Sequence, residues 1–296
     1  MSEQGARIYD VGYRSYDGPR RGPSWALVTL WRHTLQRVLG LHRSFRHKVL
    51  PGIALVIAFL PALIFAGISA FLPVDPIVED ILPSYGEYVG FITMALVLFA
   101  SFVAPEALCT DRRSGMLDLY LAGPLDVTRY LAAKWAAVAG VMLVMTIGPQ
   151  LFLLIAFSIE DAGPSLAETP LLLGKIAVSG IGVAAVYTAL AMGVSSLTSR
   201  RAVAAVSTVL LLLVPPIVVG VTTESAGAPD ELALLSASGV ALDFAARVFD
   251  GLRRPLEADE PIERLSSGLV VGALLAWIAL GALVCVASYR LQGRRR

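Results

Sequence analysis

Charged side chains are scarce in this sequence: they make up 16% of the 296 residues, whereas 56% are hydrophobic. Soluble domains carry about 25% charged residues, so the composition argues against a soluble protein and indicates a membrane protein. Asparagine is absent, and lysine is nearly replaced by arginine. This bias is typical of a GC-rich genome and predicts a bacterial source.

Residues for catalysis and metal binding are also few. The sequence has no phosphate-binding loop, no Gly-x-Ser-x-Gly elbow and no His-Glu-x-x-His pair, so we expect no enzyme activity, no ATP hydrolysis and no cofactor in this chain. The three histidines all lie in the basic N-terminal region without a metal-site partner, so no metal site is predicted. Cys109 and Cys285 are expected near the inner membrane face, where thiols stay reduced, so no disulfide is predicted.

Six uncharged runs have about the length that a helix needs to cross a membrane, roughly 20 residues. They lack the alternation of a membrane β-barrel, so the predicted fold is an all-α membrane protein with six transmembrane helices. The second run is the shortest, and its helix is expected to continue beyond Pro105. The runs are residues 50–72, 88–104, 135–159, 176–199, 202–223 and 265–289.

The interiors of these runs lack ionisable groups, which argues against ion-coupled carriers and ion channels. The polar groups there are expected to be structural, because each can bond a carbonyl one turn back or a neighbouring helix. Small residues at four-residue steps predict a close-packing stripe on the fourth run, at Ala185, Ala189 and Gly193. Kinks are expected at Pro149 and at Pro215–Pro216.

Charge is distributed unevenly between the segments that connect the runs. With the N-terminus inside, the inner segments hold 19 of the 24 Lys and Arg residues, and the outer segments hold 16 of the 23 acids. The positive-inside rule therefore predicts a multi-pass protein of the bacterial cytoplasmic membrane with both termini cytoplasmic.

Residues 1–48 are expected to form a cytoplasmic leader followed by an amphipathic helix from Ser24 to about His47, and residues 49–296 the transmembrane domain. An apolar stripe recurs at helical spacing, and the other face is basic, so the helix is expected in the inner membrane interface with its arginines on anionic lipids. A basic stretch that only sets topology is the alternative, and the membrane surface explains the arginines better than nucleic acid does. The stripe is Leu27, Trp31, Leu35, Val38, Leu41 and Phe45; the basic face is Arg32, Arg37, Arg43, Arg46 and His42.

The cytoplasmic loop 105–134 is charged but patterned. Pro105 and Glu106 suit the first turn of a helix, Ser114 can cap a short helix at residues 116–121, Gly123–Pro124 stops that helix, and Asp126 can cap the next one. Lys134 is expected near the membrane interface. The short helix has an apolar face bracketed by charges, which is typical of a docking surface. Its residues are Met116, Leu117, Tyr120 and Leu121, with Arg112, Arg113 and Asp118 at the edges.

The outer segment 224–264 is too long for an unstructured connection and carries a second amphipathic pattern. One or two helices folded against the outer membrane face are expected, either as an exit gate or as a passive cap on the bundle. The pattern consists of Leu232, Leu235, Leu242, Ala245, Phe249 and Leu252.

The chain resembles permeases of type-2 ABC exporters. In the loop after the second run, the resemblance lies in a glutamate at the end of that span, the basic residues followed by Gly115 and Leu117, the Gly-Pro at Pro124 and a lysine ten residues later. The opening IYDVGYRSYDGPRRG is similar to the leaders of actinobacterial permeases. It covers nearly the whole chain and implies the type-2 permease fold.

The resemblance implies a subunit that exports an amphipathic or lipid-like substrate or drug. Two separate ATPase subunits would bind ATP and Mg, and a second copy or paralogue of the permease would complete the transporter. The short helix and its charged edges would couple to the ATPase. The second and fifth spans would line the path, with Glu106, Phe102, Met94, Thr208 and Leu212 as candidate residues.

A membrane scaffold or assembly protein without transport activity is the alternative function. An adjacent gene that encodes a phosphate-loop protein would favour the permease. An intramembrane enzyme is disfavoured by the missing catalytic groups.

Overall fold

The computed structural model describes residues 18, 22–71, 83–121, 125–159, 167–226, 228–249 and 261–294, but not the side chains of residues 118, 121, 224–226, 261, 263 and 292–294. Most of the predicted leader and the expected stop at Gly123–Pro124 lie outside the described residues. The described residues contain helices only, and six of them are long and apolar enough to span a membrane, which confirms the predicted fold class.

The second span is composite, because α4 (Tyr85–Leu98) continues through the π-helix η1 (Phe99–Val103) into α5 (Glu106–Arg113). The predicted continuation of this helix beyond Pro105 is therefore confirmed. The other spans are α2 (Arg46–Phe71), α7 (Val127–Ile159), α8 (Thr169–Leu197), α9 (Arg201–Ala226) and α11 (Ser267–Arg294).

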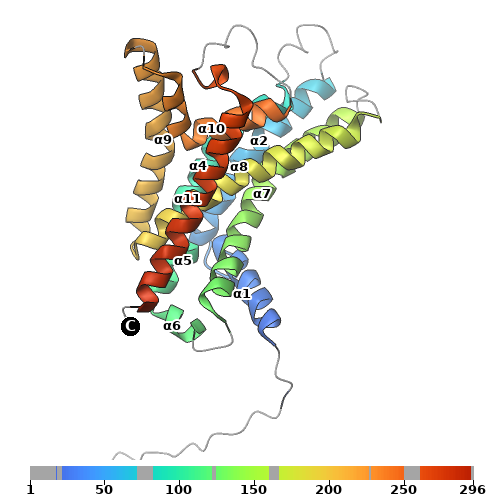
Figure 1. The fold of residues 1–296 in the computed structure, drawn as a ribbon. Coiled ribbons are helices and arrows are strands. Elements are labelled where there is room, and N and C mark those ends of the chain that lie inside the picture. The colour runs from blue at the N-terminus through green and yellow to red at the C-terminus, as the bar shows by residue number, and fades with distance from the viewer. Residues whose placement is uncertain are drawn as a thin grey trace, which may run out of the picture.

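The shorter helices lie at the two ends of the bundle (Figure 1). One end, which we call the α6 end, carries α1 (Pro23–Val38), α6 (Met116–Leu121) and the C-terminal end of α11. The opposite α10 end carries α10 (Ala237–Val248) and the short helices η2 (Asp230–Leu235) and η3 (Pro261–Arg264). Because the number of spans is even, α1 and the C-terminal end of α11 lie at the same end of the bundle.

Helix α8 lies at the centre of the bundle and packs along α11 at very short range. A Cβ atom built on Gly281 would lie 2.4 Å from the carbonyl oxygen of Ala189, and one built on Gly193 would lie 3.0 Å from the carbonyl oxygen of Gly281. The small side chains thus let the two backbones touch. This confirms the close-packing stripe at Ala189 and Gly193, with Ala185 half-buried one turn before.

Helix α10 packs among α4, α8, α9 and α11 rather than lying flat on an outer face, and its buried side coincides with the predicted pattern only in part. Ala237, Val240 and Ala241 are buried outside the pattern, whereas Leu242 is half-buried and Leu235, which lies in η2, is 59% exposed. Small residues occupy the buried side because α10 approaches the spans closely: a Cβ on Gly86 of α4 would lie 3.1 Å from the Cα of Ala246. Of the predicted pattern, Ala245 is buried and Leu252 lies outside the described residues.

Helix α1 ends at Val38, nine residues before the predicted end. Gly40 causes the stop: its φ is 67°, its N–H donates to Arg37 and the N–H of Leu41 donates to Gln36, which together form a Schellman motif. The buried face of α1, which packs against α7, coincides with the predicted stripe only in part: Val38 of the stripe is buried beside Leu30 and Thr34, but Trp31 is exposed.

We predict that the same substitution has opposite effects at two glycines of α11. Gly281→Ala should lower the melting temperature in detergent, since its methyl group would meet the backbone of Ala189. Among the described residues, no other helix lies within 4 Å of the position that a methyl group would take on Gly272, so Gly272→Ala should stabilise the helix by about 0.5–1 kcal/mol. Equal melting temperatures for the two variants would contradict the close approach of α8 and α11.

Candidate functional site

A continuous helical arm projects from the second span toward α6. It begins with a capping box, in which Ser84 and Glu87 bond each other's backbone N–H groups, a start that the sequence analysis missed. It ends at Ser114 and Gly115, and the φ of 69° at Gly115 allows the sharp turn into α6. The Ser114 hydroxyl donates back to the carbonyl of Thr110 at 2.8 Å, so the prediction that it caps α6 is wrong. The arm therefore connects α6 to the second span through a single turn.

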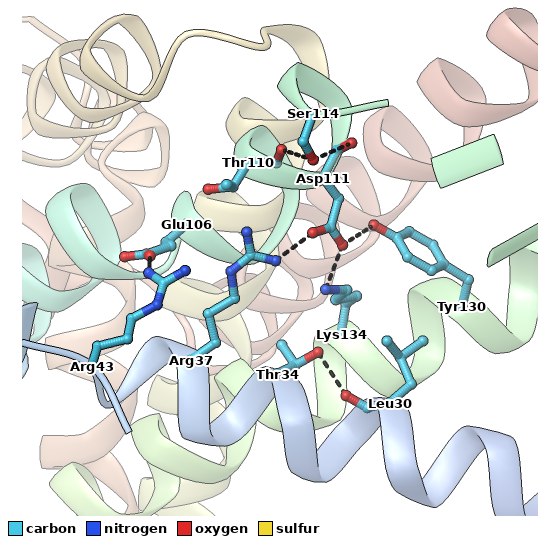
Figure 2. A network of polar contacts seen from close by, with 10 residues as sticks. All are labelled: Leu30, Thr34, Arg37, Arg43, Glu106, Thr110, Asp111, Ser114, Tyr130 and Lys134. Carbon is cyan, nitrogen blue, oxygen red and sulfur yellow. Dashed lines mark hydrogen bonds and ion pairs between the residues drawn. The ribbon is translucent and has the colours of Figure 1, made fainter. Parts of the chain in front are cut away.

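Asp111 lies near the end of the arm, in α5, and binds three side chains from two other helices (Figure 2). Its carboxylate forms ion pairs with Arg37 of α1 at 2.5 Å and with Lys134 of α7 at 2.6 Å. The hydroxyl of Tyr130, also on α7, donates to the same carboxylate at 3.0 Å. We call Asp111, Arg37, Lys134 and Tyr130 the Asp111 cluster.

The Asp111 cluster is almost completely buried. The side chain of Asp111 is 1% exposed, that of Lys134 is not exposed at all, and that of Arg37 is 12% exposed. Lys134 is thus buried within the protein, where the carboxylate of Asp111 compensates its charge, and its position near the membrane interface stays a prediction. Removing water from charged groups costs several kcal/mol per ion, so each charge depends on its partners.

Aromatic side chains extend the cluster to α6 and α11. The rings of Tyr120 on α6 and Tyr130 lie 5.8 Å apart, and the Lys134 ammonium lies 5.9 Å from the ring centre of Tyr120. Tyr130 also contacts Tyr289 of α11, with 5.9 Å between ring centres. Five helices thus meet around one carboxylate.

Glu106 forms a second ion-pair centre, at the start of α5. Its carboxylate pairs with Arg43 in the turn between α1 and α2 and, at 3.2 Å, with Arg201 at the start of α9. Arg201 also donates to the carbonyl oxygen of Phe102 in η1, from Nη2 at 2.6 Å. The second and fifth spans are therefore joined at the α6 end.

The predicted role of α1's arginines on lipid headgroups changes for two of them. Arg37 binds Asp111 and Arg43 binds Glu106, because this side of the α1 region faces the arm rather than the membrane surface. Arg43 also lies beyond the end of α1. Trp31 and Arg32 are exposed, as an interfacial role requires.

The residues at the edges of α6 have different surroundings. Arg112 donates to the carbonyl of Ser196 at the end of α8, where helix carbonyls lack intrahelical partners, and Arg113 is exposed. On α6 itself, Leu117 is buried, whereas Met116 and Leu119 are 39% and 66% exposed. Leu119 was not predicted, and the side chains of Asp118 and Leu121 lie outside the described residues. The outward apolar surface of α6 is therefore Met116 and Leu119.

The candidate path residues do not form one surface within a single chain. Met94 and Phe102 are exposed, at 59% and 38%, whereas Thr208 and Leu212 are buried. The Thr208 hydroxyl donates to Ala204 one turn back, as expected for a structural polar group. Among the residues with described positions, no three His, Cys, Asp or Glu side chains could hold a metal ion.

The family model described as ABC-2 family transporter protein matches residues 73–236, more than half of the chain. The match extends from the segment before α4 to η2 and contains Glu106, Asp111 and Lys134, but not α1. No individual curated protein matches the sequence significantly.

We predict that Asp111→Asn destabilises the protein by about 3–5 kcal/mol, since it leaves two buried cations without a counter-charge. Adding Lys134→Met should recover part of the loss, because the remaining Arg37 can be partly solvated. Thermal unfolding of the single and double variants in detergent measures this coupling.

Asp126→Asn is the matched control for this prediction. Asp126 caps α7 from the surface, accepting from the N–H of Arg129 at 2.8 Å, and this bond lowers the pKa of Asp126. Asparagine caps a helix about as well as aspartate, so the control should keep its melting temperature. If Asp111→Asn were equally silent, the Asp111 cluster would not stabilise the α6 end.

Proposed function

The chain belongs to the ABC-2 family of transporter proteins, and from this we propose that it is the permease subunit of an exporter driven by separate ATPase subunits. As a membrane component of this family, the chain is not itself catalytic. Two ATPase subunits would bind ATP and Mg, and a second permease, identical or related, would complete the transporter. The alternative is a membrane scaffold without transport activity.

The continuous arm from α4 to α6 is the observation that carries the proposal. Force applied to α6 can reach the second span because only the two-residue turn at Ser114–Gly115 separates α6 from α5. The Asp111 cluster attaches the same arm to α1 and α7, and Glu106 attaches it to α9. ATP-driven closure of the partner subunits would thus shift several spans together between inward-open and outward-open states.

The chemistry of the described spans supports an amphipathic or lipid-like substrate or drug as cargo. Away from the α6 end, the buried polar side chains in the spans are uncharged, among them Thr146, Gln150 and Thr208. The second and fifth spans would line the path, with Met94, Phe102 and Glu106 on the second and Thr208 and Leu212 on the fifth. The exposed faces of Met94 and Phe102 suit a path completed by the second permease.

We predict that Met116→Asp and Leu119→Asp abolish docking of the ATPase subunit. Both side chains are exposed, so the substitutions should leave the bundle folded while placing a charge in an apolar interface. The measurement is co-purification of the ATPase subunit and its ATPase rate with each permease variant, where we expect at least a tenfold loss of stimulation.

Leu235→Asp is the control for α6, since Leu235 is similarly exposed, at 59%, but lies at the α10 end. It should retain wild-type stimulation. Full stimulation by the Leu119→Asp variant would exclude α6 as the docking element.

The proposed orientation places the α6 end in the bacterial cytoplasm, with both termini on that side. We predict that an Arg113→Cys variant in intact cells resists a membrane-impermeant maleimide and reacts only after permeabilisation, while Leu235→Cys reacts from outside. The native Cys109 and Cys285 are buried, so the background should be low. The reverse pattern of labelling would invert the topology and refute an ATPase contact at α6.

A further inference from the structure

A basic pocket of about 320 Å³ lies between α1, the turn that follows it, and α6. Four basic side chains line it: His33, Arg37, His42 and Arg43. Met116 and Tyr120 form its α6 side, and Gln36 lies among the basic residues on the α1 side. The pocket thus lies between α6, which is the proposed docking helix, and α1, which the Asp111 cluster attaches to the arm.

The pocket has more positive than negative charge around it. None of the described residues that line it is acidic. The two carboxylates behind it, Asp111 and Glu106, are each shared by two cations. Desolvation, followed by the charges of Lys134 and Arg37, lowers the pKa of His33, which is consistent with a positive local potential.

The backbone at the rim of the pocket is unusual. His42 has a φ of 60°, in the left-handed region that residues with a side chain seldom adopt. Such conformations are strained and are concentrated at binding and switch sites. The turn that contains His42 is held by the Schellman motif before it and by the ion pair of Arg43 with Glu106.

The position of the pocket on α1 argues against a lipid as its occupant. At about 100° per residue, His33, Gln36 and Arg37 lie on one flank of α1, with the exposed Trp25 three turns before Gln36, and the exposed apolar Val28 and Trp31 lie on the opposite flank. The buried face of α1, with Leu30 and Thr34, separates the two flanks. If the apolar flank contacts the membrane, the pocket opens away from it, on the side of α6.

We propose that this pocket receives an acidic side chain, Asp or Glu, of the ATPase subunit that docks on α6. The inference rests on the proposed function and adds the chemistry of the contact. A carboxylate there balances the excess of cations, and it makes α1 a second docking element beside α6. Movement of the ATPase subunit then acts on both ends of the Asp111 cluster, through α1 and through α6.

Opposite charges at Gln36 test the proposal without disturbing either ion-pair centre. Gln36→Glu changes the shape of the side chain very little but adds a negative charge to the pocket, and Gln36→Lys adds a positive one. The full-length permease in detergent is titrated with the ATPase subunit with which it co-purifies. We expect Gln36→Glu to raise the dissociation constant at least tenfold and Gln36→Lys to leave it unchanged or lower it.

A second measurement identifies the contact directly. Asp and Glu residues on the permease-facing surface of the ATPase subunit are changed to Lys one at a time. One of these variants should bind Gln36→Glu more tightly than it binds the wild-type permease. Melting temperatures of the Gln36 variants check that both are folded.

The outcomes separate the two levels of the proposal. If the wild-type permease binds no ATPase subunit, the proposed function fails and this contact fails with it. If it binds but both Gln36 variants have the wild-type dissociation constant, or both weaken it equally, the acidic contact alone is refuted. A change confined to the binding of phosphatidylglycerol vesicles or of inorganic phosphate would assign the pocket to a phosphate group and overturn the proposal.

Discussion

The burial of one carboxylate, Asp111, is the constraint on which the α6 end of this protein depends. A lone charge at a site with 1% exposure is unstable, and Asp111 is stabilised there by Arg37, Lys134 and Tyr130. The converse also holds, because Lys134 has no exposure and needs this carboxylate. Apolar burial against α7 alone would leave α1 free to slide along the bundle. Directional ion pairs specify one position for α1 relative to the arm.

The parts of the fold that follow from local sequence could be predicted, and those that depend on pairing between distant residues could not. The six spans and α6 follow from runs and stop signals within a few residues of one another. Asp111 and Lys134 lie near the ends of apolar runs, where single charges are usually solvated, and their pairing joins residues 23 positions apart in different helices. The sequence did contain one signal for this ion pair, namely an acidic and a basic residue near the inner ends of consecutive spans. The early end of α1 could have been read from Gly40 as a helix stop.

Three backbone carbonyls at irregular or terminal positions of the spans accept hydrogen bonds from side chains of other helices. Pro216 has no N–H, so the carbonyl of Leu212 one turn back lacks its helical donor, and the Ser238 hydroxyl of α10 donates to it at 2.7 Å. At the α6 end, Arg201 donates to the carbonyl of Phe102 in η1, and Arg112 donates to Ser196 at the end of α8. A membrane interior offers no water for these carbonyls, so each irregularity specifies a partner helix. The prolines of α9 could be predicted to interrupt its bonding, but not which helix would compensate.

Helix α9 is held in the structure by different contacts from those that hold α8. In their most apolar stretches, 72% of the residues of α8 are buried but only 28% of those of α9. Because little of α9 is packed within the chain, its polar bonds contribute a large share of what holds it: Arg201 binds Glu106 and Phe102 at one end, and Leu212 accepts from Ser238 nearer the other. The burial of α9 is close to that of α2 and α11, in each of which 22% of the most apolar stretch is buried. In the proposed exporter, one of the elements that would move relative to α8 is therefore α9. Glu106 is where the arm from α6 reaches it.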